Sequence, residues 1–283
     1  MVKFFKYLIF LFTITSCEKM FYKPVDNVIP FDSPKLFIDA RVIEGDSLIV
    51  LAGVSTPILN EDNSPILDSN TTVKLFENDK LVSVLDPGPQ LSIYSGNFST
   101  PFVPSAGNTY RIEASRKGYE TAYGEEFLKE PPKISNVLVD SSGELLTVSF
   151  NIEDDPNTKD YYRLTSEQSF TSNINDIYFL SNGVLLGGNN MVRGVDGFLH
   201  DSNLSESKGV VKIRFDKRWS SYHIKIYRVS ELYFSHTKAK TVQYNQQLEP
   251  ELAFLSAPVQ LHSNITNGYG LVACASKVEI KLN

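Results

Sequence analysis

Cysteine is scarce in this sequence, whose 283 residues include only Cys17 and Cys274. If Cys17 is modified, as the residues before it indicate, Cys274 has no partner and an intramolecular disulfide is excluded. The fold must then be stabilised by its hydrophobic core. Because Cys274 lies in the apolar run GLVACASKVEIKL, we expect a buried structural thiol rather than an exposed nucleophile.

The sequence also lacks a hydrophobic run near its start that is long enough to cross a bilayer, which needs about 20 apolar residues. The apolar run at residues 7–12 follows Lys3 and Lys6 and precedes small polar residues. This order is typical of a secretory signal peptide. We therefore expect residues 1–16 to be a signal peptide and not a transmembrane anchor.

The signal ends in Ile14-Thr15-Ser16-Cys17, which resembles the bacterial lipobox, where the cysteine sulfur receives a thioether-linked lipid. Acyl chains such as palmitate would hold the protein on a membrane, since each buried methylene contributes about 0.8 kcal/mol. The alternative is an ordinary signal that ends at a cysteine by chance. Residues 17–33 contain Pro and Asp without a hydrophobic period, which predicts a tether.

Positive charge is in the minority, with 27 Lys and Arg against 33 Asp and Glu and a net charge of −6. Loss of residues 1–16 removes two lysines and leaves a net charge of −8. Nucleic acid and anionic lipid surfaces are therefore poor candidates as partners. The hydrophobic content of 42% excludes a disordered chain.

Short runs of β-branched and aromatic residues separated by turn residues are abundant. Val73 and Leu75 alternate with polar residues, and Tyr110 and Ile112 repeat the pattern. Apolar residues at every second position, with turn signals about every eight to twelve residues, predict strands with one solvated face. We assign residues 34–130 to an Ig-like or transthyretin-like antiparallel β-sandwich.

Pro131 and Pro132 predict a stiff connection to a second β-rich domain at residues 131–283, because adjacent prolines remove backbone donors and disfavour helix before them. A hairpin is expected around Gly143. The region from about residue 171 to 207 is rich in Asn, Gly and Ser. We expect long loops there.

One short amphipathic helix is expected in the second domain. Ser230 followed by Glu231 is a typical helix start. Its apolar face would consist of Leu232, Ala239, Val242 and, less regularly, Phe234. The predicted fold class is therefore mainly β with a single helix.

No catalytic signature is present. The four histidines show no i, i+4 pair, and no nucleophile elbow, zinc-protease helix or phosphate loop occurs. We therefore predict no catalytic residue, no cofactor and no metal. The neighbouring carboxylates Asp154-Asp155 and Glu125-Glu126 would serve a glycosidase only if the fold brought suitable partners together.

The stretch DDPNTKD raises the alternative of a calcium site. Asp154, Asp155, Asn157 and Asp160 place four oxygen-bearing side chains within seven residues, and Ca²⁺ takes about six to eight oxygen ligands. The spacing is not that of an EF-hand. Pro156 and the flanking strands favour a solvated hairpin turn instead.

Aromatic side chains are frequent in the second half: Tyr161, Tyr162, Trp219, Tyr222 and Tyr227. Exposed, they would form a stacking platform for a sugar ring or a peptide; buried, they would be part of the core. Core positions are favoured for most of them. Tyr161 and Trp219 are kept as candidate contact residues.

The order of several motifs resembles that of one protein family. The motifs are PKLFIDARV, NTYRIEASRKGYE, EPPKI, DDPNTKDYYRL, HIKIYRVS and PVQLHSNITNGYGLVACAS. Together they span nearly the whole chain and are similar to a family of Bacteroidota lipoproteins known as domain of unknown function 4249. The resemblance implies an outer-membrane lipoprotein, commonly encoded beside TonB-dependent receptors. The chain departs from the family in its Asn-rich middle and at Tyr269, where a smaller aliphatic residue is more usual.

The stretch SNITNGYG contributes most to this resemblance. Asn and Gly tolerate left-handed backbone angles, so a tight turn into the last strand is predicted. The alternative is that the turn presents Asn264 and Tyr269 to a partner.

Three functional hypotheses follow. The first is a non-enzymatic accessory lipoprotein that binds an outer-membrane β-barrel, a TonB-dependent transporter, and helps capture or position cargo. The second is a structural subunit of an outer-membrane assembly or secretion machine, and the third is a glycan or peptide hydrolase with an unrecognised site. Glu18 and Lys19, directly after Cys17, resemble a surface-export signal. We therefore expect a lipid-anchored protein on the external face of the outer membrane.

Overall fold

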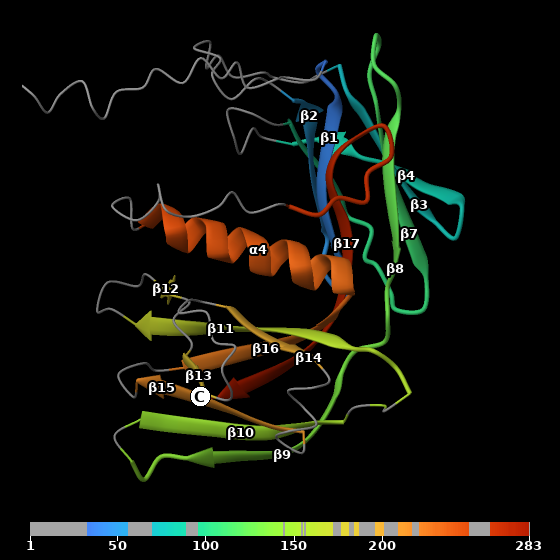
Figure 1. The fold of residues 1–283 in the computed structure, drawn as a ribbon. Helices are drawn as coiled ribbons and strands as arrows, with labels where there is room; N and C mark the ends of the chain where they lie inside the picture. Colours follow the sequence, from blue (N-terminus) through green and yellow to red (C-terminus); the bar gives the residue numbers. More distant parts are fainter. Residues whose placement is uncertain are drawn as a thin grey trace, which may run out of the picture. The chain divides into compact units, whose positions relative to one another are not determined.

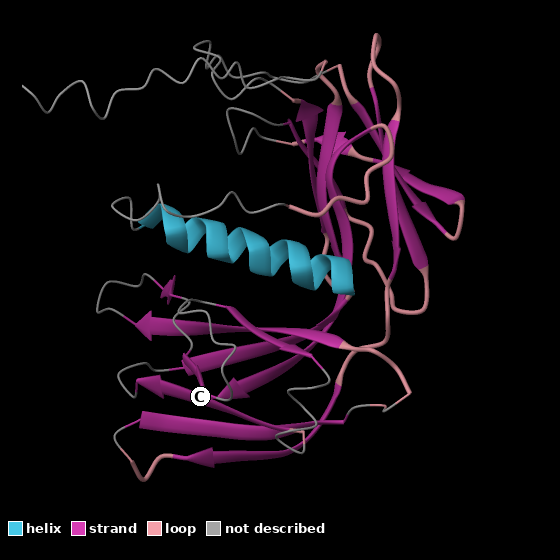
Figure 2. Cartoon of the chain, in the orientation of Figure 1, coloured by secondary structure: helices cyan, strands magenta, loops and turns pink. Residues whose placement is uncertain are grey.

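A computed structural model of the chain describes residues 33–55, 70–88, 96–143, 145–153, 155, 157–171, 177–180, 184–186, 196–200, 209–216, 221–248 and 261–282. Strands predominate in this part of the chain (Figures 1 and 2). Residues Pro34–Asn283 form one compact unit. The predicted tether, the signal and Cys17 lie outside the described residues. None of the described helices is long and apolar enough to span a membrane.

The strands belong to three sheets. The largest contains β1 (Leu36–Ile43), β2 (Leu48–Val54), β5 (Asp86–Pro87), β6 (Gly96–Thr100), β11 (Tyr161–Thr171), β12 (Ile177–Leu180), β14 (Asp196–His200), β16 (Ser221–Val229) and β17 (Gly268–Leu282). The second contains β3 (Thr72–Glu77), β4 (Lys80–Val84), β7 (Thr109–Ser115) and β8 (Ala122–Phe127). The third contains β9 (Lys133–Asp140), β10 (Leu145–Glu153), β13 (Val184–Leu186) and β15 (Val210–Asp216).

Strand β17 joins the two halves of the largest sheet, whose order is β12-β11-β16-β17-β1-β2-β6-β5, with β14 also paired to β11. Residues 268–275 pair with β1 in parallel, and residues 275–282 pair with β16 in antiparallel fashion. The mainly β fold is confirmed, with one parallel pair inside an otherwise antiparallel arrangement. The predicted domain division at Pro131 stays a prediction. Strand β17 pairs with β1, which precedes Pro131 in the chain, and with β16, which follows it.

The first sandwich packs β1, β2 and β17 against the β4-β3-β7-β8 sheet. Its core includes Leu36, Ile38, Val73, Leu75, Tyr110, Ile112, Val272 and Cys274. These residues alternate along their strands, as the period-two pattern predicted. A second core lies between β10, β15 and the facing strands β11 and β16: Val148, Phe150, Tyr162, Leu164, Ile213, Ile224 and Ile226.

Helix α4 (Glu231–Leu248) packs on the other face of the largest sheet. Its Tyr233 and Phe234 share a buried cluster with Leu271 and Ala273 of β17. Among the α4 side chains that the structure describes, the buried ones are Tyr233, Phe234, His236 and Thr237. Of the residues predicted for the apolar face, Phe234 is buried and Leu232 packs, partly buried, against the same cluster. Ala239 is only partly buried, and the Val242 side chain lies outside the described residues. The helix start is confirmed, since the Tyr233 amide donates to Ser230 Oγ at 3.0 Å.

The region predicted to form long loops contains three described strands. β12 and β14 pair with β11, and β13 pairs with β15. The prediction was wrong for residues 177–180, 184–186 and 196–200, which form strands because β11 and β15 pair with them. The other residues from 172 to 207 lie outside the described residues. The hairpin around Gly143 is confirmed by the antiparallel pairing of β9 and β10.

Candidate functional site

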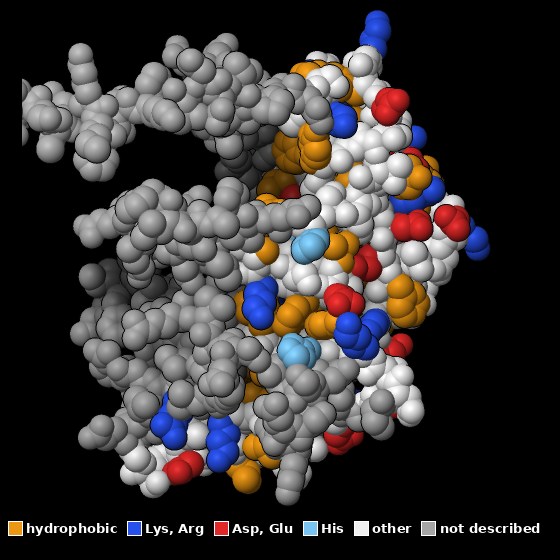
Figure 3. Space-filling view, viewed as in Figure 1, with side chains coloured by type: hydrophobic (Ala, Val, Ile, Leu, Met, Phe, Trp, Pro, Cys, Tyr) orange, Lys and Arg blue, Asp and Glu red, His pale blue; other side chains and the backbone are white. Residues whose placement is uncertain are grey.

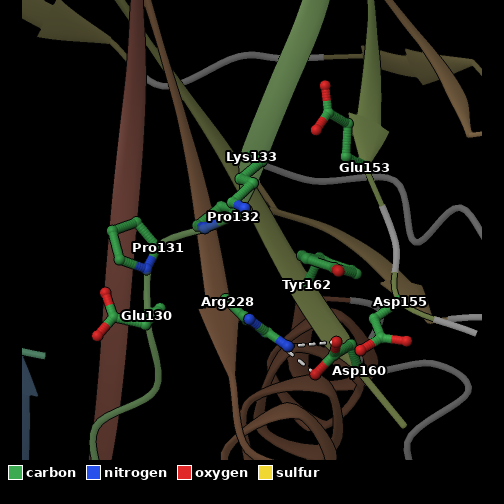
Figure 4. Close-up of a pocket in the computed structure, with 9 residues that line it drawn as sticks. All are labelled: Glu130, Pro131, Pro132, Lys133, Glu153, Asp155, Asp160, Tyr162 and Arg228. Carbon is green, nitrogen blue, oxygen red and sulfur yellow. Dashed lines mark hydrogen bonds and ion pairs between the residues drawn. The ribbon is translucent and has the colours of Figure 1, made fainter. Parts of the chain in front are cut away.

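A pocket of about 390 Å³ opens where the chain passes from β8 to β9. It is lined by Glu130, Pro131, Pro132, Lys133, Glu153, Asp155, Asp160, Tyr162 and Arg228 (Figure 4). The connector residues line one side, and residues of β10, the DDPNTKD turn and β11 line the other. Its volume lies within the range of about 300–1,000 Å³ that is typical of small-molecule sites.

Asp160 is the most strongly engaged charge of this pocket. Its side chain is 1% exposed. The carboxylate accepts hydrogen bonds from Arg228 Nε at 3.1 Å and Nη2 at 2.5 Å, from Lys129 Nζ at 2.9 Å and from Thr158 Oγ1 at 2.8 Å. Burial raises the pKa of Asp160, but the hydrogen bonds from Arg228, Lys129 and Thr158 outweigh it and hold the pKa below its usual value. The ionised carboxylate therefore ties the β8–β9 connector to β11 and β16.

Asp155 belongs to a hydrogen-bonded turn. Its carboxylate accepts from the Asn157 amide at 2.9 Å and from Asn157 Nδ2 at 3.0 Å. Asp154 lies outside the described residues. Within the described ranges, no group of three or more His, Cys, Asp or Glu side chains could hold a metal ion. The predicted solvated hairpin was wrong, because β10 and β11, which this segment joins, belong to different sheets and do not pair with each other. The Asp160 carboxylate is buried and binds Arg228 and Lys129.

Asn264 stabilises the turn into β17. Its Nδ2 donates to the Val272 carbonyl at 2.8 Å, and the Val272 amide donates to its Oδ1 at 2.9 Å. The Asn264 side chain thereby forms the two hydrogen bonds with Val272 that the backbone of a neighbouring strand would form. Asn267 has a φ of 59°, which is the left-handed turn geometry that the sequence predicted. The polar atoms of Asn264 serve this turn, so the side chain has little left for a partner.

Gly270 allows β17 to approach β1 closely. Its φ is +109°, and a Cβ at this position would overlap the Ile38 carbonyl oxygen. No other residue type combines this backbone angle with this approach. The last glycine of the SNITNGYG stretch is therefore explained by the parallel pairing of β1 and β17.

The remaining candidate contact residues differ in exposure. Tyr269 is 39% exposed, and Lys35 Nζ lies 5.4 Å from its ring centroid. Tyr161 is 8% exposed and packs 5.1 Å from the Phe234 ring, which is the core position favoured for most of these aromatics. Trp219 lies outside the described residues. On the face shown in Figure 3, described hydrophobic side chains form separate patches among charged ones.

Cys274 and Glu126 contact each other where β8 meets β17. The Cys274 thiol is 3% exposed and donates to the Glu126 carbonyl at 3.3 Å, and the Cys274 amide donates to the Glu126 carboxylate. Burial, with the Glu126 charge, raises the pKa of Cys274 well above its usual value. The sulfur therefore stays a neutral thiol, as expected for a structural cysteine.

Burial also raises the pKa of Glu126, although hydrogen bonds from the Cys274 amide and Ser230 and the charge of Lys129 oppose the effect. Glu125 is exposed while Glu126 is half-buried, because neighbouring residues of a strand point to opposite faces. The two carboxylates thus do not form a pair.

Sequence reasoning missed the partners of Asp160. Lys129 lies 31 residues and Arg228 68 residues away in the chain. No local spacing pattern signals contacts of this range. The contact of Glu126 with Cys274 spans 148 residues and was missed for the same reason.

The fold and these contacts define a mainly β protein in which the buried Asp160 carboxylate is bound by Arg228 and Lys129. The chain matches the family described as "Domain of unknown function (DUF4249)" over residues 22–281, and it belongs to that family. None of the curated proteins matches the chain. The family description assigns no activity.

Several solved structures resemble parts of the chain. A β-glucuronidase from Parabacteroides merdae has 13% identity and a TM-score of 0.22, with 70% of this chain and 23% of that chain covered. A putative carbohydrate binding protein from Bacteroides uniformis ATCC 8492 has 11% identity and a TM-score of 0.23, with 87% and 98% covered. A DUF3823 family protein from Parabacteroides merdae ATCC 43184 has 13% identity and a TM-score of 0.17, with 70% and 92% covered. The chain spans about a quarter of the β-glucuronidase that it matches. Similarity this low carries no argument about activity or ligand.

Proposed function

We propose that this chain is a non-enzymatic lipoprotein, anchored through Cys17 on the external face of the outer membrane. There it acts as an accessory subunit of an outer-membrane β-barrel, a TonB-dependent transporter, and helps capture or position cargo. The proposal rests on the order of segments in the sequence: a predicted signal that ends in Cys17, a predicted tether at residues 17–33, and then the compact unit Pro34–Asn283.

The contacts of the ionisable groups support a binding role. Asp160 is bound by Arg228 and Lys129, and the Glu126 carboxylate is held by the Cys274 amide. These groups stabilise the fold and are not poised for proton transfer or nucleophilic attack. Tyr269 and the 390 Å³ pocket offer accessible surface to a partner and to cargo.

The test is a pull-down of the tagged full chain from outer membranes in mild detergent, with mass spectrometry of the proteins recovered. A transporter barrel in near-equal amount is expected, together with its loss in Cys17→Ala. Recovery of an assembly or secretion barrel would point to a structural subunit instead. Recovery of no barrel at all would overturn the proposal.

A matched pair of exposed aromatics refines this test. Tyr269→Ala should reduce recovery of the barrel, whereas Phe127→Ala, at a position 53% exposed, should not. Protease treatment of intact cells tests the location. Survival of the protein alongside an intact periplasmic control would exclude the external face.

A further inference from the structure

One end of the first sandwich is the point where the predicted tether joins the compact unit. Strand β1 begins there, and its Leu36 pairs with Gly268 at the start of β17. A Cβ at Gly268 would lie 2.9 Å from the Cβ of Ala122, so β8 begins at the same end. The β7–β8 hairpin, residues 116–121, therefore projects from the end at which the chain enters the unit (Figure 1). We call residues 33–35 and 116–121 the tether end.

The tip of this hairpin is a hydrogen-bonded turn with two basic side chains. The Tyr119 amide donates to the Arg116 carbonyl at 3.1 Å, and Gly118 has a φ of 89°. Lys117 and Gly118 are therefore the two central residues of the turn, and both are exposed. Tyr119 packs, partly buried, against the first core, and the Arg116 guanidinium lies 5.8 Å from the centroid of its ring. The fold thus presents Lys117 at the tip, next to an arginine and a tyrosine.

Charge differs between the tether end and the opposite end of the sandwich. The charged residues of the tether end are three basic ones and one acidic one: Lys35, Arg116, Lys117 and Glu120. At the opposite end, the turns that follow β1 and β3 carry Glu44, Asp46 and Asp79. The net negative charge of the whole chain argued against anionic surfaces as partners. The tether end has the opposite sign, so that argument does not apply to it.

We propose that the tether end contacts the phosphate headgroups of the bilayer that carries the Cys17 anchor. The inference rests on that proposed anchor, because residues 17–33 span at most about 60 Å when fully extended and so keep the tether end close to the lipid. Lys and Arg side chains near a bilayer are attracted to anionic headgroups, and a tyrosine ring suits the boundary between lipid and water. The contact orients the compact unit, with the turns that follow β1 and β3 directed away from the membrane.

Chemical anchoring tests this contact without the lipidation machinery of a cell. The chain from Cys17 onward, which keeps the whole compact unit, is coupled through the Cys17 thiol to a maleimide-bearing lipid. Cys274 should not compete, because its side chain is 3% exposed. Neutral phosphatidylcholine vesicles are compared with vesicles that also contain phosphatidylglycerol. Amine acetylation, followed by mass spectrometry, should modify Lys117 several-fold more slowly on the anionic vesicles, and high salt should abolish the difference. Lys80, exposed at the opposite end, should react equally on both.

Two charge reversals provide a matched comparison, with thermal unfolding to show that both variants fold. Lys35→Glu reverses a charge of the tether end and should weaken the protection of Lys117 several-fold. Lys80→Glu makes the same change at the opposite end and should leave that protection unchanged. Equal acetylation of Lys117 on the two kinds of vesicle, or equal effects of the two variants, would overturn the proposal. Because the anchor in this assay is chemical, such a result would contradict the contact alone, whereas a Cys17 that carries no lipid in cells would contradict the proposed anchor.

Discussion

The two halves of the described chain are stabilised by different kinds of interaction. In the first half, β1 lies between β2 and the C-terminal strand β17, and the core around it is apolar. In the second half, the buried carboxylate of Asp160 joins Arg228 and Lys129 between strands and connector. Strand β17 pairs with both halves. The first half therefore adds a close backbone approach at Gly270, and the second half adds a buried network of charges. Substitutions in the two regions should therefore lower the stability of the protein for different reasons.

The largest effect is expected from Gly270→Ala. The new Cβ would meet the Ile38 carbonyl oxygen, and the φ of +109° would be strained. Because the obstacle is backbone, β1 and β17 would have to separate, at a cost of about 4 kcal/mol or more. Urea unfolding measures the loss.

Gly118→Ala is the matched control for this change. Gly118 also has a positive φ, +89°, but no atom lies within 4 Å of its added Cβ. Its expected cost is about 1 kcal/mol. Equal losses in the two variants would show that close approach to β1 is not what requires Gly270.

Asp160→Asn should have the next largest effect, in the second half. It leaves Arg228 and Lys129 without their carboxylate, at an expected cost of about 2–3 kcal/mol in the free energy of unfolding. Arg228→Lys keeps the charge but loses the two-pronged contact, so a smaller loss is expected. The two variants can be compared by chemical denaturation. A fully stable Asp160→Asn protein would contradict a stabilising role for the network.

Asn264→Ala returns the test to the first half, with a smaller effect. The Val272 amide and carbonyl would lose their side-chain partner, at about 2 kcal/mol for the two hydrogen bonds. Asn264→Asp keeps the acceptor and loses the donor, so it should fall between wild type and Asn264→Ala. Thermal unfolding of the three proteins gives the order. Another order would mean that the two hydrogen bonds are not what Asn264 contributes.

The smallest expected effect is a difference in pH dependence between two carboxylates. Because the pKa of Asp160 is lowered in the folded state, its stabilisation is present above the unfolded pKa and is lost as the pH falls through the folded pKa. The raised pKa of Glu126 has the opposite sign: its contribution is present at low pH and is lost as the pH rises through the folded pKa.

Melting temperatures at roughly pH 3–8 for wild type, Asp160→Asn and Glu126→Gln test both signs. Asp160→Asn should gain less stability as the pH rises from acid. Glu126→Gln should lose less stability over the same change. Identical profiles for the three proteins would show that neither carboxylate is linked to folding.

Several local features could be predicted from the sequence. The alternation of Val73 and Leu75, and of Tyr110 and Ile112, gave the strands of the first sandwich. Ser230 predicted the helix start, and the apolar run around Cys274 predicted that this cysteine is buried. Each of these depends on neighbouring residues alone, because strand period and helix capping act over a few positions.

The candidate site was much less predictable. The carboxylates of the DDPNTKD turn were recognisable, but nothing near them indicates that Asp160 binds Arg228 and Lys129. Tyr161 had two open interpretations, core and contact surface, and its contact with Phe234 of α4 shows the core position. Which side chains of α4 are buried also depended on the sheet that the helix covers.

By itself the sequence determined the strands of the first sandwich, the turn before β17, the helix start and the family, since these depend on short-range patterns and motif order. Only the tertiary structure decided that β17 lies between β1 and β16 and that Asp160 is bound by cations from distant segments of the chain. Strand partners are chosen by how the whole chain buries its apolar surface and pairs its backbone groups. That choice involves residues up to two hundred or so positions apart, which no local pattern encodes.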